Sequence, residues 1–359
     1  MPQCYQGRLG VRYSKEQWQS FHNPDKMELS ENMLGIYRSD RSMTPAVTMM
    51  RQLMQTENEA MPYLYDRSED MFPILTLYAT SSHYSIYHNQ SVEALRNHIY
   101  VNRGLRLQSD VIPEQLFSTR NQEAIGHPRL IMIPGAMRLS DACFEQLMET
   151  VQNGCTVLIS GNIEENEYFE DSVRLGVLEK ETCFKKRHVR NYEELQIGDR
   201  RFQLDFRKNC DYGDTENFLS AFVNEDIYRE GVFYVKTYQV GKGRVIYCPL
   251  PVELAQNQEI TKSLYELAME ETGITKDIYS VEADKEHIFI HSIVYAKCTE
   301  YTIINEGATD SILLTDMRGK TTYKIGLPSG RSCKLWIGQD GRLVGKYAND
   351  GVSVMQINR

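Results

Sequence analysis

The run RLIMIPGAMRLSDACFEQLMETVQNGCTVLISGN, residues 129–162, decides the fold class of this chain. It begins and ends with apolar segments, residues 129–135 and 155–160, that have the length of strands buried in a sheet. Ser140 can cap a helix between them, and Gly154 follows the end of that helix. The apolar residues of this helix fall on one face: Phe144, Leu147 and Val151. A strand, a helix and a second strand in this order predict a parallel sheet with helices on both faces.

The same alternation continues on both sides of this run. The further predicted elements are strands at residues 72–79, 105–111, 232–240 and 244–248 and helices at residues 90–103 and 258–271. Residues 241–243 read Gly-Lys-Gly, which is typical of a hairpin turn. Residues 163–230 are acidic and irregular, and we expect them to form an insertion with some strands, such as residues 201–206. Residues 67–276 are therefore predicted to be one α/β domain.

The two ends of the chain depart from this pattern. From about residue 278 onward, short alternating strands are separated by turns, which predicts a small antiparallel β-sandwich at residues 277–359. Residues 1–66 are polar and irregular at first and then contain one amphipathic helix, which Thr44 can cap and whose first turn suits Pro45. Because one such helix needs a surface to pack on, we do not expect this segment to fold alone.

Composition and charge exclude several kinds of partner. The chain has 359 residues and a formal net charge of −9, which argues against a nucleic-acid partner because phosphate binding requires clustered Lys and Arg. We expect the densest basic run, residues 185–187, to be a solvated loop. No segment approaches the roughly 18 apolar residues of a membrane span, and residues 1–8 lack the apolar region of a signal peptide. We therefore expect a cytoplasmic protein with no membrane partner.

The cysteines indicate neither a metal site nor a redox site. The eight cysteines include no CxxC pair, the spacing typical of zinc and redox sites. Cys155 and Cys248 lie in apolar runs, so we expect them to be small buried hydrophobic residues. Scattered free thiols fit a reducing compartment. The chain also contains no GxGxxG and no Walker motif, and the sequence predicts no metal and no cofactor.

Two nucleophile arrangements find little support in the sequence. An amidotransferase-type enzyme places a nucleophilic Cys at a sharp strand-to-helix turn, but the turn after Ile159 reads Ser-Gly-Asn, residues 160–162. Residues 81–84, Ser-Ser-His-Tyr, follow a predicted strand at a place where sites form. No Asp is placed nearby by sequence, so we expect a loop that binds or packs.

Carboxylates are too numerous to identify a catalytic pair. A pair of Asp or Glu residues would suit glycoside hydrolysis, but the chain has 49 of them and a pair arises by chance. We expect Glu164-Glu165 and Glu193-Glu194 to be solvated faces.

Two stretches resemble a known family. Residues 34–46, LGIYRSDRSMTPA, resemble the GLYRxDGSxKPAA run that precedes the last helix of (β/α)8-barrel glycoside hydrolases, with Arg41 where Gly is usual and Thr44 where Lys is usual. Residues 129–161 resemble the flavodoxin-like trimerisation domain of family-42 beta-galactosidases, with a strand ending in Pro and a small residue, a Leu-Ser helix start, and Gly on both sides of the next strand. Residues 241–245, GKGRV, are similar to a hairpin of that domain, and a C-terminal β-sandwich follows in the family.

The resemblance implies a domain order for this chain. Residues 1–66 would be the end of a catalytic barrel, followed by a flavodoxin-like (class I glutamine amidotransferase-like) trimerisation-type domain and a β-sandwich. The catalytic carboxylates of the family lie on earlier barrel strands. Since a barrel needs roughly 250 residues, no catalytic residue is carried over to this chain. The residues that could line a sugar site are Trp18, His22, Glu28 and Glu31.

Three functions follow as hypotheses. The first is a non-catalytic C-terminal portion of a beta-galactosidase-like glycoside hydrolase, whose partners would be copies of itself in a trimer, a catalytic barrel chain and a carbohydrate. The second is a standalone small-molecule or carbohydrate-binding protein on an amidotransferase-like fold, with a pocket formed by residues 80–84, 135–138 and 161–164. The third is an amidotransferase-like hydrolase with an unrecognised nucleophile.

Overall fold

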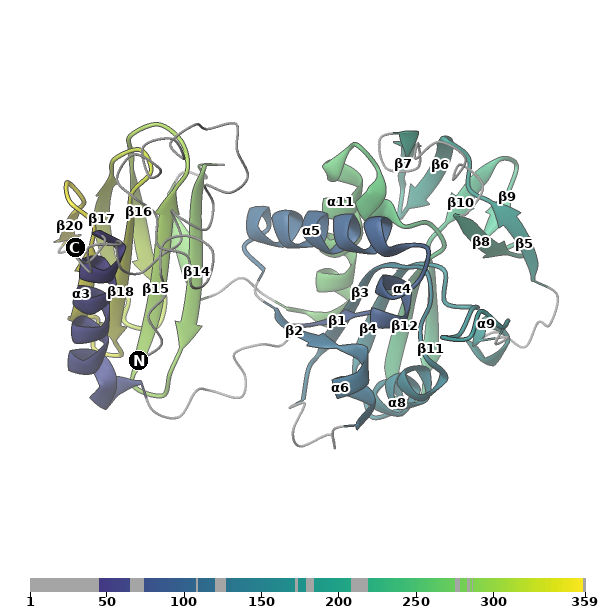
Figure 1. Ribbon diagram of the computed structural model, residues 1–359, viewed down its shortest axis with the longest axis horizontal. Helices are drawn as coiled ribbons and strands as arrows, with labels where there is room; N and C mark the ends of the chain where they lie inside the picture. The colour runs from purple at the N-terminus through teal and green to yellow at the C-terminus, as the bar shows by residue number, and fades with distance from the viewer. Residues whose placement is uncertain are drawn as a thin grey trace, which may run out of the picture. The chain divides into compact units, whose positions relative to one another are not determined.

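The structure is a computed structural model in which two compact units can be distinguished (Figure 1). The α/β unit comprises Arg67–Ser280 with Asp284–Ile293, and the β unit comprises Met1–Asp66, Val281–Ala283 and Val294–Arg359. The residues described are 45–64, 74–107, 109–119, 127–171, 174–178, 184–207, 219–274, 278–282, 285 and 287–357.

A six-stranded sheet forms the centre of the α/β unit. Its strands are β1 (Ile74–Tyr78), β2 (Asp110–Pro113), β3 (Leu130–Ala136), β4 (Thr156–Gly161), β11 (Lys236–Val240) and β12 (Gly243–Cys248). They lie in the order β11-β12-β4-β3-β1-β2, and all neighbours are parallel except the β11–β12 hairpin. Strands of a parallel sheet are covered on both faces, and β3 and β4 are accordingly buried along almost their whole length. The predicted α/β class with a parallel sheet is confirmed.

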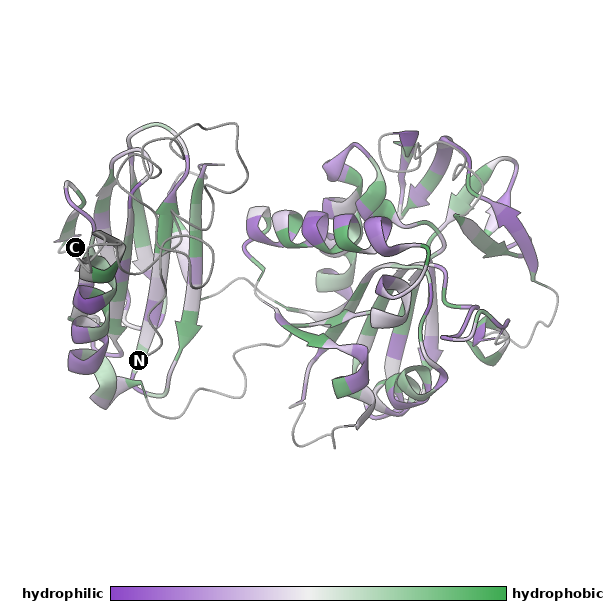
Figure 2. Cartoon of the chain, in the orientation of Figure 1, coloured by the Kyte–Doolittle hydropathy of each residue, from purple (hydrophilic) through white to green (hydrophobic). Residues whose placement is uncertain are grey.

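Helices cover both faces of this sheet (Figure 1). On one face α5 (His88–Gly104) and α11 (Gln258–Thr272) contact each other and β3. On the other face lie α6 (Glu114–Thr119) and α8 (Asp141–Gln152), which also contact each other. In Figure 2 α5 shows alternating hydrophilic and hydrophobic bands, the pattern of a helix with one face on a core.

The ends of these elements test the sequence prediction more closely. Ser140 caps α8 as predicted, because its side chain accepts a hydrogen bond from the backbone N–H of Cys143 at 3.3 Å. The strand predicted at residues 105–111 is displaced, since β2 begins only at Asp110. Leu105 and Leu107 do not belong to a strand. They are apolar because they are buried in the core just beyond α5.

Gly161 allows the ends of β3 and β4 to approach each other closely. Its φ is +98°, and a Cβ at this position would lie 2.1 Å from the carbonyl oxygen of Ala136. An L side chain would therefore meet both an unfavourable backbone conformation and a backbone atom.

The insertion at residues 163–230 packs its apolar side chains into the same core. Its elements are α9 (Arg174–Leu178), a two-stranded sheet of β5 (Lys185–His188) and β8 (Ser220–Val223), and most of a four-stranded sheet with the order β7-β6-β10-β9. That sheet contains β6 (Tyr192–Ile197), β7 (Arg200–Asp205), β9 (Tyr228–Arg229) and β10 (Val232–Tyr234). The prediction of a loop at residues 185–187 is wrong, because these residues pair with β8 as part of β5.

Two four-stranded sheets follow, with the orders β13-β16-β17-β20 and β14-β15-β18-β19. Their strands are β13 (Tyr279–Val281), β14 (Ile288–Val294), β15 (Cys298–Asn305), β16 (Asp310–Asp316), β17 (Thr321–Leu327), β18 (Ser332–Gly338), β19 (Leu343–Ala348) and β20 (Ser353–Ile357). The buried hydroxyl of Tyr301 on β15 donates a 2.6 Å hydrogen bond to Asp316 on β16, which links the two sheets. This arrangement agrees with the predicted antiparallel sandwich.

The predicted N-terminal helix, α3 (Pro45–Ala60), packs against β19 of the β unit and is followed by the short helix η1 (Met61–Tyr63). Ala60 and Trp336 are both fully buried where the helix meets the sheet. The ammonium of Lys334 lies 2.6 Å from the carboxylate of Glu57 on the helix and 2.9 Å from that of Glu300 on β15. The β unit therefore provides the surface on which this amphipathic helix packs.

Candidate functional site

The carboxyl ends of the parallel strands meet at one edge of the sheet, where open α/β folds bind their ligands. We refer to this region as the carboxyl edge. It is formed by α4 (Thr80–His83) after β1, residues 137–140 after β3, residues 162–166 after β4 and η4 (Val252–Leu254) after β12. The strand order reverses between β1 and β3, so the geometry favours a site beside α4.

Ser82 occupies this position but serves as a cross-link. Its hydroxyl donates to the carbonyl oxygen of Arg138 at 2.8 Å and accepts from the N–H groups of Met137 at 3.0 Å and Arg138 at 2.8 Å. The residue is fully buried. Since these three bonds use the donor and both acceptor positions of the hydroxyl, Ser82 is not available as a nucleophile. The expectation that this segment packs agrees with the structure, although the segment is a short helix.

His83 completes no triad with its neighbouring serines. Its ring lies 4.2 Å from the ring of His88, centroid to centroid. The pKa of His83 is lowered by burial and by the nearby His88. The two imidazole rings are tilted by 49° to each other and pack together at the end of α4.

The buried carboxylate of Glu114, which the sequence analysis did not single out, connects two of the loops at the carboxyl edge. Glu114, at the start of α6, accepts hydrogen bonds from the N–H of Ser81 at 2.9 Å, the hydroxyl of Ser81 at 2.5 Å and the N–H of Ser140 at 2.8 Å. Only 1 % of its surface is exposed. It therefore joins the loops that follow β1 and β3. It directly follows the observed β2 and lies three residues beyond the strand predicted at residues 105–111, which is why the sequence did not single it out.

A second buried carboxylate, that of Glu253 on η4, connects the strand ends on the other side of β3. It accepts hydrogen bonds from the hydroxyls of Ser160 at 2.6 Å and Tyr265 at 2.7 Å and from the N–H of Gly135 at 3.1 Å. Complete burial raises the pKa of Glu253, and the hydrogen bonds oppose that rise. The three donors come from two strand ends and from α11, so this carboxylate fixes their relative positions.

His98 on α5 extends the second network into the core. Its Nδ1 lies 2.8 Å from the hydroxyl of Tyr265, and its Nε2 lies 2.8 Å from the hydroxyl of Thr76. Because Tyr265 donates its only hydroxyl hydrogen to Glu253, His98 must donate from Nδ1 and accept at Nε2. Burial lowers the pKa of His98 to about 3, so the ring is neutral at physiological pH.

The loop after β4 closes the carboxyl edge with an ion-paired cluster. The Arg138 guanidinium donates to Glu165 at 2.9 and 3.1 Å, and Lys186 lies 2.6 Å from the other oxygen of that carboxylate. The ring of Phe169 covers the guanidinium, with its centroid 3.1 Å away. Phe169 itself has a φ of +72°, which is uncommon for a bulky residue.

Several carboxylates expected at solvated faces are in fact buried. Glu164, Glu165 and Glu193 are 3 %, 4 % and 4 % exposed. Glu165 pairs with Arg138 and Lys186, Glu193 pairs with Arg187, and Glu164 accepts from a backbone N–H on α9. The expectation is wrong for these three residues because charge counting along the sequence cannot detect partners supplied by distant segments, whereas the side chain of Glu194 is 42 % exposed. The loops at residues 80–84, 135–138 and 161–164 are held by hydrogen bonds among their own residues, such as those of Ser82 to Met137 and Arg138.

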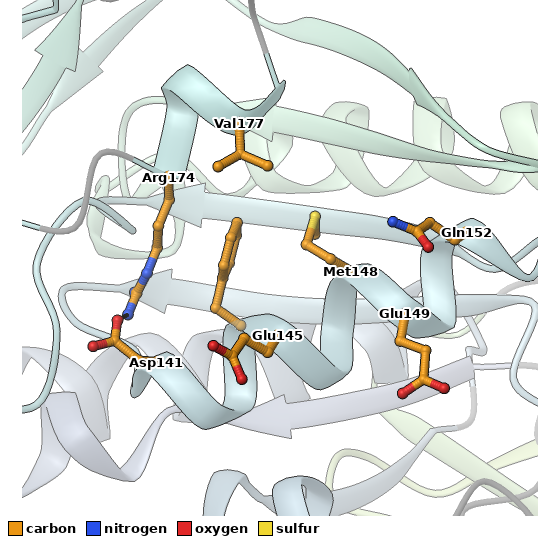
Figure 3. Close-up of a pocket in the computed structure, with 8 residues that line it drawn as sticks. Asp141, Glu145, Met148, Glu149, Gln152, Arg174 and Val177 are labelled. Carbon is orange, nitrogen blue, oxygen red and sulfur yellow. Dashed lines mark hydrogen bonds and ion pairs between the residues drawn. The ribbon is translucent and has the colours of Figure 1, made fainter.

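A groove does open elsewhere on the α/β unit, between α8 and α9 (Figure 3). We call it the α8 groove. Its volume is about 500 Å³, and its lining comprises Asp141, Phe144, Glu145, Met148, Glu149, Gln152, Arg174 and Val177. Arg174 reaches across to Asp141 at 2.6 Å, while Val177 is 70 % exposed. The groove has an apolar floor and an acidic rim, with no arrangement for proton transfer.

The remaining predicted features have the following outcomes. Trp18, His22, Glu28 and Glu31 lie outside the described residues. Cys155 and Cys248 are free and buried as predicted, and burial raises the pKa of Cys155 to about 12. Within the described part of the chain, no group of three or more His, Cys, Asp or Glu residues could hold a metal ion. None of the helices described there is long and apolar enough to cross a membrane.

Comparison with known proteins gives matches among solved structures, while no family model and no curated protein matches the sequence. A catalytic mutant of Gan42B, a GH42 beta-galactosidase from G. stearothermophilus, matches with a TM-score of 0.55 and 14 % identity over 93 % of this chain and 47 % of that one. A beta-galactosidase from Bacillus circulans sp. alkalophilus matches with a TM-score of 0.57 and 12 % identity over 90 % of this chain and 46 % of that one. A polyextremophilic beta-galactosidase from the Antarctic haloarchaeon Halorubrum lacusprofundi matches with a TM-score of 0.52 and 14 % identity over 85 % of this chain and 44 % of that one.

These matches bear on the fold, because the identities are too low to carry an activity from one protein to the other. The chain spans less than half the length of each of these structures. The resemblance to GH42 beta-galactosidases seen in the sequence is confirmed at this level. The chain therefore has the fold of a part, amounting to less than half, of a GH42-type beta-galactosidase.

Proposed function

We propose that this chain is a non-catalytic, C-terminal portion of a glycoside hydrolase of beta-galactosidase type, used for oligomer assembly and active-site support in carbohydrate degradation. The observation that carries the proposal is the coverage of the structural matches. Between 85 and 93 % of this chain corresponds to 44 to 47 % of three beta-galactosidases. The catalytic barrel would be supplied by another polypeptide or by a preceding segment.

We assign the α/β unit as a flavodoxin-like domain of the trimerisation type. The parallel strands β2-β1-β3-β4-β12 stand in the order second, first, third, fourth and fifth along the chain, which is the flavodoxin-like order. The domain limits that we propose are residues 1–66, 67–276 and 277–359. A closed trimer would bury faces of this domain that are exposed in a single copy.

The buried carboxylates support a role other than hydrolysis. A catalytic pair must face a substrate across an open site. Among the described residues, the buried carboxylates Glu114, Glu165 and Glu253 instead accept hydrogen bonds that hold the carboxyl edge together. Any sugar contact would then come from Trp18, His22, Glu28 and Glu31, for which the family resemblance is the support.

We place the protein in the cytoplasm. The five described cysteines that are free and buried support this location, because free thiols persist in a reducing compartment.

Light scattering of the purified chain, with a panel of nitrophenyl glycosides assayed on the same sample, tests this function. A trimer that hydrolyses none of the glycosides is the expected result. A monomer that hydrolyses any of them would overturn the proposal, because a catalytic pair would then lie within this chain.

A further inference from the structure

The α8 groove is shaped for a chain segment with basic side chains. Phe144 and Met148 are buried in its floor, and Val177 stands at its wall with 70 % of its surface exposed. Single exposed apolar side chains are common on protein surfaces, so the charge at the rim is a stronger indication of a partner than Val177 is. The aliphatic stems of lysine or arginine could cover such a surface while their charges reach the rim.

The rim of the groove carries negative charge that its own subunit leaves partly uncompensated. Asp141, Glu145 and Glu149 follow one another at intervals of four residues on α8, and all three are exposed. Like charges at this spacing destabilise a helix slightly. Asp141 is paired with Arg174. In the described part of the chain, Glu145 and Glu149 pair with no cation, although Glu149 accepts a hydrogen bond from Gln146.

The complementary surface lies on the same α/β unit. β5 contains the densest basic run of the chain and is drawn hydrophilic in Figure 2. Among the described strands, its pairing partner is β8. Lys186 and Arg187 have carboxylate partners in their own subunit. Lys185 and Arg190 are exposed, and neither has an ion-pair partner among the described residues.

We infer that the α8 groove of one copy binds the basic segment at residues 185–190 of a second copy, with Lys185 and Arg190 facing Glu145 and Glu149. This inference rests on the proposed assembly function and names its surface. No residue of β5 lines the groove in its own subunit. The two surfaces are different patches of one unit, so the contact is heterologous, and a heterologous contact whose rotation closes gives a ring.

Light scattering of the full chain at low and at high salt tests the inference, with circular dichroism to establish that each variant is folded. The variants are Glu145→Lys with Glu149→Lys, then Lys185→Glu with Arg190→Glu, and all four changes combined. The matched control is Glu266→Lys with Glu270→Lys, an exposed pair at the same spacing on α11. Each charge reversal is expected to raise the dissociation constant by about tenfold or more at low salt and to reverse its salt dependence, because salt then screens a repulsion. The combined variant should regain the oligomeric mass, and the control should keep it.

An oligomer of unchanged mass in the Glu145→Lys, Glu149→Lys variant would overturn the proposed surface and leave the assembly function standing. A wild-type chain that stays monomeric at every concentration would overturn the assembly function and the surface together. Failure of the four-fold variant to regain the mass, with both reversals dissociating the oligomer, would show that the two patches do not face each other.

Discussion

The carboxyl edge and the α8 groove lie on the same unit but differ in their carboxylates, which are buried at the edge and exposed at the groove. At the carboxyl edge, Glu114 and Glu253 are 1 % exposed and each accepts three or more hydrogen bonds. At the groove, Glu145 and Glu149 are exposed on one helix face. The carboxylates at the edge where this fold ordinarily binds ligands have partners within the unit, whereas the outer helix α8 exposes two carboxylates that pair with no cation among the described residues. The difference supports the assembly function proposed above.

If the carboxyl edge is a rigid structural element, its closest backbone approach should be the most sensitive position. Gly161→Ala is expected to lower the free energy of unfolding by about 4 kcal/mol, because the Cβ adds both an unfavourable φ and a collision with Ala136. Gly198→Ala is the control, since its φ is +53° and no atom lies within 4 Å of the new Cβ. Urea unfolding of both variants measures the difference. Equal losses would mean that the strand ends can separate at little cost.

The buried histidine should make the stability of the α/β unit depend on pH. The pKa of His98 is lowered from 6.5 to about 3, so the unfolded chain binds a proton in the pH range where the folded chain does not. Stability is therefore present above pH 6.5 and is lost as the pH falls toward 3, by about 3 kcal/mol between pH 7 and pH 4.

Unfolding curves of the wild type and of His98→Gln across this range isolate the effect. The variant should be less stable at pH 7 but should lose less stability on acidification. The raised pKa of Glu253 acts in the opposite direction, since its protonation favours the folded state at low pH. Parallel pH profiles of the two proteins would show that His98 takes up its proton without unfolding.

A substitution at Ser82 tests whether this residue stabilises the carboxyl edge or reacts as a nucleophile. Ser82→Ala leaves the N–H groups of Met137 and Arg138 without their acceptor, which should cost about 2 kcal/mol of unfolding free energy. Ser118 is half-buried on α6, and its hydroxyl donates to the carbonyl of Gln115 in the same helix, so Ser118→Ala should change the free energy of unfolding by less than about 0.5 kcal/mol. Chemical denaturation compares the two. A Ser82→Ala protein as stable as the wild type, or a stoichiometric reaction of Ser82 with a serine-directed probe, would contradict the cross-link.

The α8 groove should tolerate change in the single subunit. Val177→Ser replaces two methyl groups by one hydroxyl at a side chain that is 70 % exposed, so the free energy of unfolding should change by less than about 0.5 kcal/mol. Thermal unfolding measured at a concentration where the chain is monomeric tests this. A loss comparable to that of Ser82→Ala would place Val177 in the core and remove the contrast between the two regions.

The sequence was most informative where local pattern and tertiary packing agree. The apolar runs at residues 129–135 and 155–160 predicted β3 and β4, and Ser140 predicted the start of α8, because burial and capping act over a few residues. It was least informative where distant segments supply the partners. Glu165 is buried beside Arg138 and Lys186, which reach it from the loop after β3 and from β5. The groove depends on Arg174 and Val177 of the insertion, whose pattern could not be interpreted in advance.

The packing of α3 on β19 has a consequence for biosynthesis. Glu57 and Lys334, which tie the helix to its unit, are separated by 277 residues. At a translation rate of about 5–20 residues per second, roughly 15–55 seconds pass between the emergence of these two residues. The α/β unit is made during that delay and can fold first, while the amphipathic helix that precedes it has no surface to cover. The helix would therefore stay undocked long enough for a chaperone to bind it. It could dock only after most of the β unit had been synthesised.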